Sequence, residues 1–554
     1  MHSAGNDMRL RTSLSWKPRH GMWYLRIDSH VLILYKQMLH GEVGMKTKSI
    51  GKRGRAGILA LLMALTFTAL GCAHQRGLQG DKATFVILMI GDGMGGWHVD
   101  ATRKYLDDGP LAMETLAHHG YMTTFMRNPG ADGSAYTSEE EHWDDPSQTG
   151  SYAPALGGDT PWDMTPVPEY VQQGATGSAA AASAMYSGKK TCKYCLNVVA
   201  KEKGYPHDAP FSVKYVPTIL DDAQALGRAA GLVTSVPFNH ATPAAAVVKT
   251  QYRKNDAEKS RQMIYSDLDV IMGAGHPCYD DNGQLHTCDY AKLQSNIGDY
   301  LDDADGVALF KLVGAGFKGR AFVENKADFE DLADGDGLYH GGLMPLRVFG
   351  LAQVANTLQY NRNIDDGDAS DDWKAGGQAH IPSVPNLRTM TEGALAVLEK
   401  DKEGFWLMVE GGAIDWASHA NNMTRMLEET IDFDKAVQAV ITWVEDPSNG
   451  SDWTNTLLIV TADHECGHLQ PVGEVRGDKV ISNQCWGVKK GGEGGAVTCE
   501  GWNQHTNCLV PIYAQGVGAK WLRARHKGDY RDNTDIFKVM SQSMKGHLSS
   551  LGCP

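Results

Sequence analysis

The sequence lacks a long apolar segment, an internal repeat and a long linker, and each absence argues against a class of protein. Its longest apolar run covers about 15 residues, fewer than the roughly 20 that a membrane-spanning helix needs. Without a repeat or a linker, the chain resembles neither a solenoid nor a string of independent domains. Its composition, 42% hydrophobic and 21% charged, is that of a globular protein rather than a fibrous or disordered one.

Positive charge is scarce beyond residue 71. The whole chain has a formal net charge of −14, and residues 1–71 hold 11 Lys and Arg against 3 Asp and Glu, which leaves a net −22 on residues 72–554. So acidic a protein is poorly suited to bind nucleic acid or an anionic membrane. An anionic substrate would need local positive charge, which a metal site can provide.

The stretch from Met45 to Cys72 is typical of a secretory signal, with a basic start, a short apolar run and small residues before a cysteine. Its last four residues resemble the lipobox of bacterial lipoproteins, which predicts a signal over 45–71 and a lipid anchor on Cys72. Because a signal belongs at the N-terminus, residues 1–44 are predicted to be a non-native upstream extension. We expect an exported protein, either periplasmic, anchored to the outer membrane or secreted, with 72–554 as a single domain.

Ten cysteines in an exported chain should mostly form disulfides. Cys278 and Cys288 flank an Asn-Gly turn and are the most favoured pair. Cys192 and Cys195 form a CxxC, either a local disulfide or half of a metal site. We expect Cys466 to be half of a disulfide. The sequence leaves open the pairing among Cys466, Cys485, Cys499, Cys508 and Cys553.

Continuous apolar runs, rich in β-forming residues, alternate with helical patterns. Runs of this kind fit strands buried on both faces of a sheet, and they cover residues 84–90, 231–236, 269–275, 404–410, 456–464 and 509–516. Residues 385–400 and 422–445 carry the apolar spacing of amphipathic helices. The sequence therefore predicts an α/β fold in one large layered domain. Polar or glycine-rich stretches at 127–172, 360–380 and 472–503 are predicted to be surface insertions.

Acidic residues and histidines follow several of these runs. They are Asp92, the set Glu410, Asp415 and His419, the pair Asp463 and His464, and His505 before the last run. Ligands of α/β sheets collect beyond the carboxyl ends of the strands. Imidazoles and carboxylates suit Zn²⁺, and all-oxygen sets suit Mg²⁺. Any one of these residues alone is more often a helix cap or a surface group, but their co-occurrence at one sheet edge predicts a metal site.

The order of motifs resembles that of the alkaline phosphatase family over residues 82–520. The matching stretches are "IGDGMG", "ATGSAAAASAMYSGKK", "HATPAA", "VEGGAID" with the following "SH", "TADHE" and a later "HT". The resemblance implies a large central, mostly parallel sheet with helices on both faces. It also implies hydrolysis of small phosphate monoesters at alkaline pH through a phosphoserine, and a homodimer.

The same resemblance implies two Zn²⁺ and one Mg²⁺. It assigns the first zinc to Asp415, His419 and His505, the second to Asp92, Asp463 and His464, and the magnesium to Asp92, Thr242 and Glu410. Ser178, at the start of its helix, would be the nucleophile rather than Ser183, and zinc would activate its hydroxyl. Arg253, eleven residues beyond Thr242 as in the family, would bind the phosphate oxygens.

Three neighbours of these residues depart from the family pattern. Gly177 stands where relatives usually have an Asp that restrains the arginine, so we expect Arg253 to be held more loosely and inorganic phosphate to leave more readily. His240 stands where some members have Asp, and Trp416 where others have Lys or His. This pairing resembles one found in some bacterial members and leaves the identity of the third metal open.

Two alternative functions are compatible with parts of the pattern. The same scaffold serves diesters or sulfate esters in relatives that generally lack the third metal site and the matching arginine, so Thr242, Glu410 and Arg253 favour monoesters. A lipoprotein that binds metal or phosphate without turnover would not need an intact nucleophile. Ser178, together with the complete ligand set, therefore favours an enzyme.

Overall fold

In this computed structural model of the protein, the described residues are 82–107, 109–126, 175–200, 213–288, 310–334, 338–363, 380–487, 489–491, 497–525 and 529–551. Residues 75–554 form one compact unit. The predicted extension, the signal, Cys72, Cys553 and the insertion at 127–172 lie outside the described residues, as do 364–379 of the second insertion. Within the described ranges, no helix is both long and apolar enough to cross a membrane.

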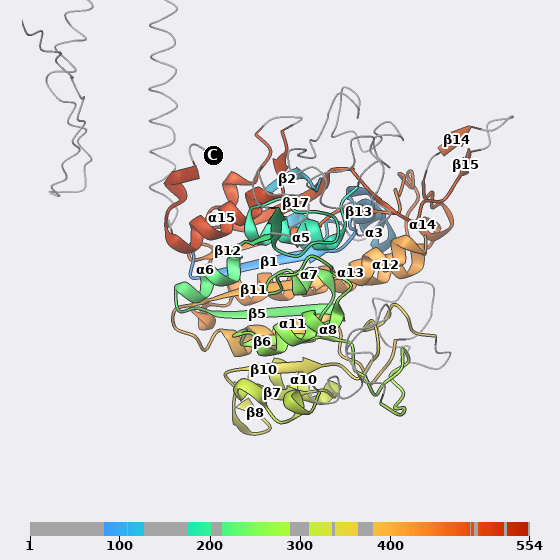
Figure 1. Cartoon of the computed structure of the whole chain (residues 1–554). Helices are drawn as coiled ribbons and strands as arrows, with labels where there is room; N and C mark the ends of the chain where they lie inside the picture. The colour runs from blue at the N-terminus through green and yellow to red at the C-terminus, as the bar shows by residue number, and fades with distance from the viewer. Residues whose placement is uncertain are drawn as a thin grey trace, which may run out of the picture. The chain divides into compact units, whose positions relative to one another are not determined.

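A mostly parallel sheet forms the centre of this unit (Figure 1). Ten strands of the described chain follow the spatial order β18-β2-β17-β12-β1-β11-β5-β6-β10-β7. In chain order they are β1 (Phe85–Gly91), β2 (His118–Thr123), β5 (Ala229–Pro237), β6 (Val270–Ala274), β7 (Ala321–Val323), β10 (Val348–Leu351), β11 (Phe405–Gly411), β12 (Thr456–Thr461), β17 (Val510–Gly516) and β18 (Arg531–Asp532). Only β17 runs antiparallel to its neighbours, β12 and β2. Each of the six predicted apolar runs overlaps a strand of this sheet, which confirms the predicted fold class.

Short two-stranded ladders supplement the main sheet. They pair β3 (Val198–Ala200) with β4 (Val213–Tyr215), β8 (Leu338–Tyr339) with β9 (Gly342–Leu343), β13 (Glu465–Cys466) with β16 (His505–Thr506), and β14 (Lys489–Gly491) with β15 (Val497–Cys499). The third predicted insertion, 472–503, contains β14 and β15. The ladder of β13 with β16 lies at the functional site and joins two distant parts of the sequence.

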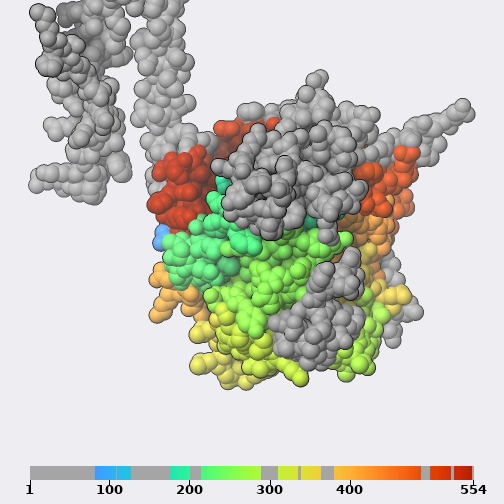
Figure 2. All heavy atoms as spheres, in the orientation of Figure 1, coloured from blue at the N-terminus to red at the C-terminus, as the bar shows by residue number. Residues whose placement is uncertain are grey.

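Helices pack on both faces of the sheet. They are α3 (Gly96–Leu106), α5 (Ser178–Ser187), α6 (Ile219–Ala225), α7 (Ala241–Ala244), α8 (Asp256–Tyr265), α10 (Lys326–Ala333), α11 (Leu387–Leu398), α12 (Ala413–His419), α13 (Met423–Glu445), α14 (Lys479–Ser482) and α15 (Thr534–Lys545). Trp406 of β11 packs on Tyr186 of α5, whereas its neighbour Phe405 packs on Trp443 of α13. Because adjacent strand residues point to opposite faces, α5 and α13 cover opposite sides. On the face drawn in Figure 2, α15 (red) lies beside the α5 and α6 region (teal).

The two predicted amphipathic helices form with side-chain caps at their N-termini. Asn386 accepts a hydrogen bond from the backbone N–H of Thr389 at the start of α11, and Asn422 accepts one from Arg425 at the start of α13. Each cap satisfies an N–H group that has no partner inside the helix. The helices at 385–400 and 422–445 are thus confirmed, with boundaries set by these asparagines.

The carboxyl ends of four adjacent strands define one edge of the sheet. The strands β12, β1, β11 and β5 are neighbours and run parallel, so their carboxyl ends point the same way. Asp92 follows β1, Glu410 lies near the end of β11, and Asp463 follows β12. The segment after β5 leads into α7, which contains Thr242. Residues far apart in the sequence are thereby brought to a single edge, as expected for ligand sites in open α/β sheets.

The disulfides agree with the sequence analysis in part. Cys278 pairs with Cys288 as predicted, and Cys192 pairs with Cys195, which decides between the two readings of the CxxC. Cys485 pairs with Cys499. The expectation that Cys466 forms a disulfide is wrong, because Cys466 and Cys508 are both free and buried. Most cysteines of exported proteins are paired. Cys466, however, lies on the buried strand β13, where its neighbours are acidic and histidine side chains.

Candidate active site

Ser178 is the first residue of α5 and faces a buried histidine. Its hydroxyl oxygen lies 3.3 Å from Nε2 of His464, and the residue is 2% exposed. Gly177 caps the helix with extended backbone and no side chain, and every residue of α5 is buried. The alanines let this helix pack closely behind the site, while its first N–H groups, which have no partner within the helix, favour an anion at its N-terminus.

Asp92, Asp463 and His464 form a fully buried cluster in front of Ser178. Nε2 of His464 lies 3.4 Å from Oδ1 of Asp92 and 3.2 Å from Oδ2 of Asp463. The other oxygen of Asp463 accepts hydrogen bonds from the backbone N–H groups of Gly93, at 3.2 Å, and of His464, at 2.9 Å. One carboxylate oxygen of Asp463 is thus held by the backbone, and the other faces the cluster.

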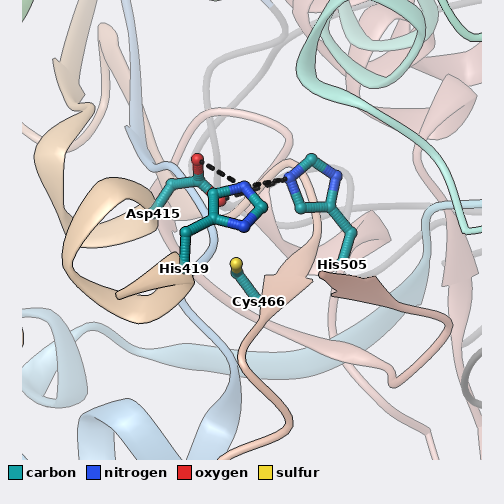
Figure 3. Close-up of side chains that lie close together, drawn as sticks. All are labelled: Asp415, His419, Cys466 and His505. Carbon is teal, nitrogen blue, oxygen red and sulfur yellow. Dashed lines mark hydrogen bonds and ion pairs between the residues drawn. The ribbon is translucent and has the colours of Figure 1, made fainter. Parts of the chain in front are cut away.

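A second cluster contains Asp415, His419, His505 and Cys466 (Figure 3). Nε2 of His419 lies 3.4 Å from Oδ2 of Asp415, and Nε2 of His505 lies 3.3 Å from Oδ1 of the same carboxylate. The two Nε2 atoms are 3.0 Å apart. In Figure 3 the rings of both histidines and the carboxylate converge on a common point, with the sulfur of Cys466 beside them.

The backbone fixes the tautomers of these two histidines. Nδ1 of His419 lies 2.6 Å from the carbonyl oxygen of Asn503, and Nδ1 of His505 lies 2.7 Å from that of Thr176. A carbonyl can only accept, so both Nδ1 atoms carry the proton and donate it. Both Nε2 atoms therefore present lone pairs at 3.0 Å from each other, an arrangement that a cation between them would stabilise.

A third group of polar atoms lies between β1, β11 and α7. Asp92 and Glu410 are fully buried and lie with His240 in one cluster, and Thr242 is also fully buried. Oε2 of Glu410 accepts a hydrogen bond from the hydroxyl of Thr234 at 2.5 Å. The ring of His240 meets the ring of Trp416 with centroids 5.9 Å apart. Trp416 thus contacts the third group through the ring of His240.

The buried acids cannot all be ionised without a compensating positive charge. Burial and the neighbouring carboxylates raise the pKa of Asp92 well above its usual range, and burial raises that of Glu410 to about 8 and that of Asp463 to about 6. Burial alone would also raise the pKa of Asp415, but His419 and the other nearby histidines outweigh it and hold that pKa well below its usual range. Asp92, Glu410 and Asp463 are therefore the acids that most require added cations.

Unpartnered atoms show that the residues fit metal ions. Several buried oxygens have no hydrogen-bond partner, and they include both carboxylate oxygens of Asp92, Oγ1 of Thr242, Oε1 of Glu410, Oδ1 of Asp415 and Oδ2 of Asp463. Leaving buried polar atoms unpaired is costly unless a ligand satisfies them. Mixed imidazole and carboxylate donors suit zinc in the first two clusters, and the oxygen-rich third group suits magnesium.

Arg253 lies between Gly177, the residue before Ser178, and His240. Its backbone N–H donates to the carbonyl oxygen of Tyr194 at 2.8 Å, and its Nη2 lies 3.4 Å from Nε2 of His240. An arginine can only donate, so Nε2 of His240 accepts, and burial together with Arg253 lowers the pKa of that histidine well below its usual range. Nη1 of Arg253 would lie 3.6 Å from a Cβ atom at position 177. The guanidinium is thus beside the N-terminus of α5, where a phosphate would bind.

The comparisons with known proteins agree with this geometry. The family model for alkaline phosphatase matches residues 167–493. The chain belongs to the alkaline phosphatase family. It is 28% identical to an alkaline phosphatase of Escherichia coli K12 over 71% of this chain and 72% of that protein. It is also 27% identical to a streptomycin-6-phosphate phosphatase of Streptomyces griseus over 89% of this chain and 97% of that protein. The family and the fold support a phosphatase.

Solved structures of alkaline phosphatases share the fold. A mutant of the alkaline phosphatase from the Antarctic bacterium TAB5, with Mg bound in its M3 site, superposes with a TM-score of 0.52. The match covers 84% of this chain and 99% of that chain, at 21% identity. This likeness supports the predicted arrangement of sheet and helices.

Every predicted site residue within the described chain lies at this edge of the sheet, but two further residues escaped the sequence analysis. Cys466, on β13, puts its sulfur among the donor atoms of Asp415, His419 and His505. Burial, followed by the charge of Asp415, raises the pKa of its thiol well above the usual range. Lys193 lies beside Gly177 and Arg253. Cys466 stands two positions after His464, and Lys193 stands inside the CxxC. Neither position belongs to a known motif, so the sequence alone could not assign either residue to the site.

Proposed function

We propose that this alkaline phosphatase family member is a metal-dependent phosphomonoesterase that hydrolyses small phosphate monoesters at alkaline pH through a phosphoserine on Ser178. The observation that carries the proposal is the position of that serine. Its hydroxyl, at the N-terminus of α5, lies 3.3 Å from Nε2 of His464 within a buried cluster of acids. The names of both relatives reported above, each a phosphatase, support the same reaction class.

Three sets of residues would hold the metal ions. They are Asp415, His419 and His505 for one Zn²⁺, Asp92, Asp463 and His464 for a second Zn²⁺, and Asp92, Thr242 and Glu410 for a Mg²⁺. When bound, the ions would supply Lewis acidity that favours the serine alkoxide, the departing alkoxide and a hydroxide ion. The TAB5 mutant, with Mg bound in its M3 site, supports magnesium as the third ion.

The chain's own groups position and stabilise the reacting phosphate. Oγ of Ser178 would attack phosphorus while the bond from phosphorus to the alcohol oxygen breaks, and the serine proton would leave with the alcohol. A water molecule would then attack phosphorus, the bond from phosphorus to Oγ would break, and a proton from that water would pass to the serine oxygen as inorganic phosphate is released. Throughout, Arg253 and the first N–H groups of α5 would donate hydrogen bonds to the non-bridging phosphate oxygens.

His240 and Trp416 would tune the magnesium set without touching the substrate. The low pKa of His240 keeps its ring neutral, so it adds no charge beside Asp92 and Glu410. Trp416 packs on that ring and restricts its orientation. Gly177 would leave the guanidinium of Arg253 without a carboxylate beside it, which favours easier release of phosphate.

The sequence also supports a proposal for where the protein acts and in what oligomeric state. The protein would be exported to the periplasm, anchored through a lipid on Cys72 or secreted, and would act as a homodimer on small soluble monoesters. Its net negative charge would repel nucleic acid. Mass spectrometry of the natural product would locate its N-terminus, and retention of residues 1–44 would contradict the predicted start.

Hydrolysis of a chromogenic phosphate monoester, compared with the matching diester at alkaline pH, tests the reaction. Zinc and magnesium should be supplied, with a chelator and Ser178→Ala as controls. We expect monoester turnover that both controls abolish. Absence of monoester hydrolysis with both metals present would contradict the proposal. Preference for the diester would instead indicate a phosphodiesterase built on the same scaffold.

A further inference from the structure

The Cys192–Cys195 disulfide closes a loop that carries Lys193 to the edge of the site. A Cβ atom at position 177 would lie 3.7 Å from Cγ of Lys193 and 3.6 Å from Nη1 of Arg253. The two cationic side chains therefore approach the same point from different segments of the chain. That point is directly N-terminal to Ser178, at the end of α5 where its free N–H groups lie.

The loop and the arginine segment are tied to each other by backbone hydrogen bonds. The N–H of Arg253 donates to the carbonyl of Tyr194 at 2.8 Å. Leu196 and Thr250 exchange N–H to carbonyl bonds of 2.9 and 3.0 Å. The disulfide thus belongs to a rigid unit that sets the positions of Lys193 and Arg253 together.

Within the described residues Lys193 has no acidic partner, in contrast to the nearby buried or half-buried Lys190 and Lys259. Lys190 forms an ion pair with Asp532 at 2.8 Å, and the buried Lys259 pairs with Asp256. Within the described residues, no carboxylate forms an ion pair with Lys193. Burial, and then the charge of Arg253, lower the pKa of Lys193. Two close cations without a counter-ion are unfavourable, and a bound anion would relieve that cost.

We propose that Lys193 is a second cationic contact for the phosphoryl group, acting with Arg253 to favour dianionic phosphate monoesters and inorganic phosphate over monoanionic esters. The identity of the anion rests on the proposed function. The stem of Lys193 lies beside Gly177, with its Cγ at an ordinary contact distance, 3.7 Å, from the Cβ that a larger residue would add there. Beyond Cγ the side chain is long enough to place its ammonium group beside phosphate oxygens at the start of α5.

Calorimetric titration of the metal-loaded protein with inorganic phosphate tests the contact without requiring turnover. Lys193→Met removes the charge but keeps the length, and we expect it to weaken phosphate binding about tenfold, the loss typical of one charge-assisted hydrogen bond. Lys193→Arg should stay within about threefold of wild type. Lys189→Met, an exposed lysine at the other end of α5, is the matched control and should bind as wild type. Equal binding by Lys193→Met and wild type would overturn the proposal, as would equally weak binding by Lys193→Arg.

Kinetics separate this proposal from the proposed function. In Lys193→Met, KM for a monoester should rise about tenfold with kcat nearly unchanged, while weak diester hydrolysis should change little because a diester carries one charge fewer. Unchanged monoester kinetics in an active enzyme would overturn the role of Lys193 alone. If the wild type binds phosphate but hydrolyses no monoester, the proposed function is wrong. Weaker phosphate binding by Lys193→Met would in that case still support the contact between Lys193 and the anion.

A double-mutant cycle tests whether the disulfide loop positions the lysine. Replacing Cys192 and Cys195 by Ser should weaken phosphate binding, and adding Lys193→Met should then cost less than it does in the wild type. Such non-additivity supports positioning by the loop. Full additivity would show that the loop does not position Lys193.

Discussion

The hydroxyl oxygen of Ser178 lies 3.3 Å from Nε2 of His464, although 286 positions separate the two residues in the sequence. The serine comes from the first turn of α5 and the histidine from the segment after β12. That same Nε2 faces Asp92 and Asp463, so the serine is aimed at the point where a cation would neutralise both acids. The pairing thus joins the candidate nucleophile to one of the proposed metal-binding clusters.

Ser178→Ala should abolish turnover while leaving the fold intact. Removing a nucleophile typically lowers kcat by about a thousandfold or more. Ser183→Ala is the matched control on the same helix, because Ser183 accepts a hydrogen bond from the N–H of Asn197 at 3.1 Å and does not face the cluster. That control should keep kcat and lose about 1 to 3 kcal/mol of stability. Comparable activity in Ser178→Ala and wild type would exclude the phosphoserine route.

The metal-free protein should become less stable as the pH rises. The pKa of Glu410 is raised to about 8 and that of Asp463 to about 6, so the folded state keeps protons that the unfolded chain releases near pH 4. The free energy of unfolding should therefore fall from about pH 4 to about pH 8. With zinc and magnesium bound, the same acids are ionised in the folded state, so most of this decline should disappear.

Thermal unfolding between pH 5 and pH 9, with a chelator and with both metals, measures this difference. Metal should raise Tm most at alkaline pH, where the unneutralised acids destabilise the fold most. Glu410→Gln should flatten the pH dependence of the metal-free form. A metal-induced shift in Tm that is the same at every pH would contradict the assignment of these acids as ligands.

Gly177→Asp should strengthen inhibition by inorganic phosphate. The backbone at this position is extended, and a Cβ atom there would meet Arg253 and Lys193 only at ordinary contact distances, so the substitution fits. The new carboxylate would restrain Arg253, and we expect the inhibition constant to fall about two- to fivefold. The measurement is best repeated in a Lys193→Met background, where the carboxylate can act only through the arginine. Unchanged inhibition in both backgrounds would count against looser holding of Arg253 in the wild type.

His240→Asp should increase the affinity for magnesium. Nδ1 of His240 has no hydrogen-bond partner, and the residue lies with Asp92 and Glu410 in one cluster. A carboxylate in its place adds an anionic oxygen, the donor that Mg²⁺ prefers, so we expect affinity to rise about tenfold. Calorimetric titration with Mg²⁺ of the zinc-loaded protein measures the change directly. Equal affinities in variant and wild type would show that position 240 does not contribute to the third metal set.

Much of the fold and of the site was predictable because both rest on patterns that are local in sequence. Buried parallel strands are apolar along their whole length, as β1 and β12 are, and the residue that follows each strand is placed at the sheet edge by topology alone. The position of Asp92 and Asp463 at this edge could therefore be predicted before any contact was known, whereas their grouping into ligand sets came from the family resemblance. The capped helices α11 and α13 were predictable for the same reason.

Contacts between distant segments were not predictable in this way. Lys193 gains its significance only because the antiparallel pairing of Leu196 with Thr250 brings its loop beside Arg253. The prediction that Cys466 forms a disulfide was wrong because it rested on the number of cysteines alone. The number of cysteines does not reveal that the ladder of β13 with β16 pairs Cys466 with His505, 39 positions away in the sequence.

The ladder of β13 with β16 also sets the order in which the site can be completed. Cys466 pairs there with His505, so the last donor of the second cluster comes from the final tenth of the chain. A polypeptide that emerges N-terminus first, from a ribosome or through a secretion channel, cannot assemble this cluster until that final part is free. Chains that end before His505 would thus lack one donor of the second cluster, so the site stays incomplete until that part of the chain has emerged.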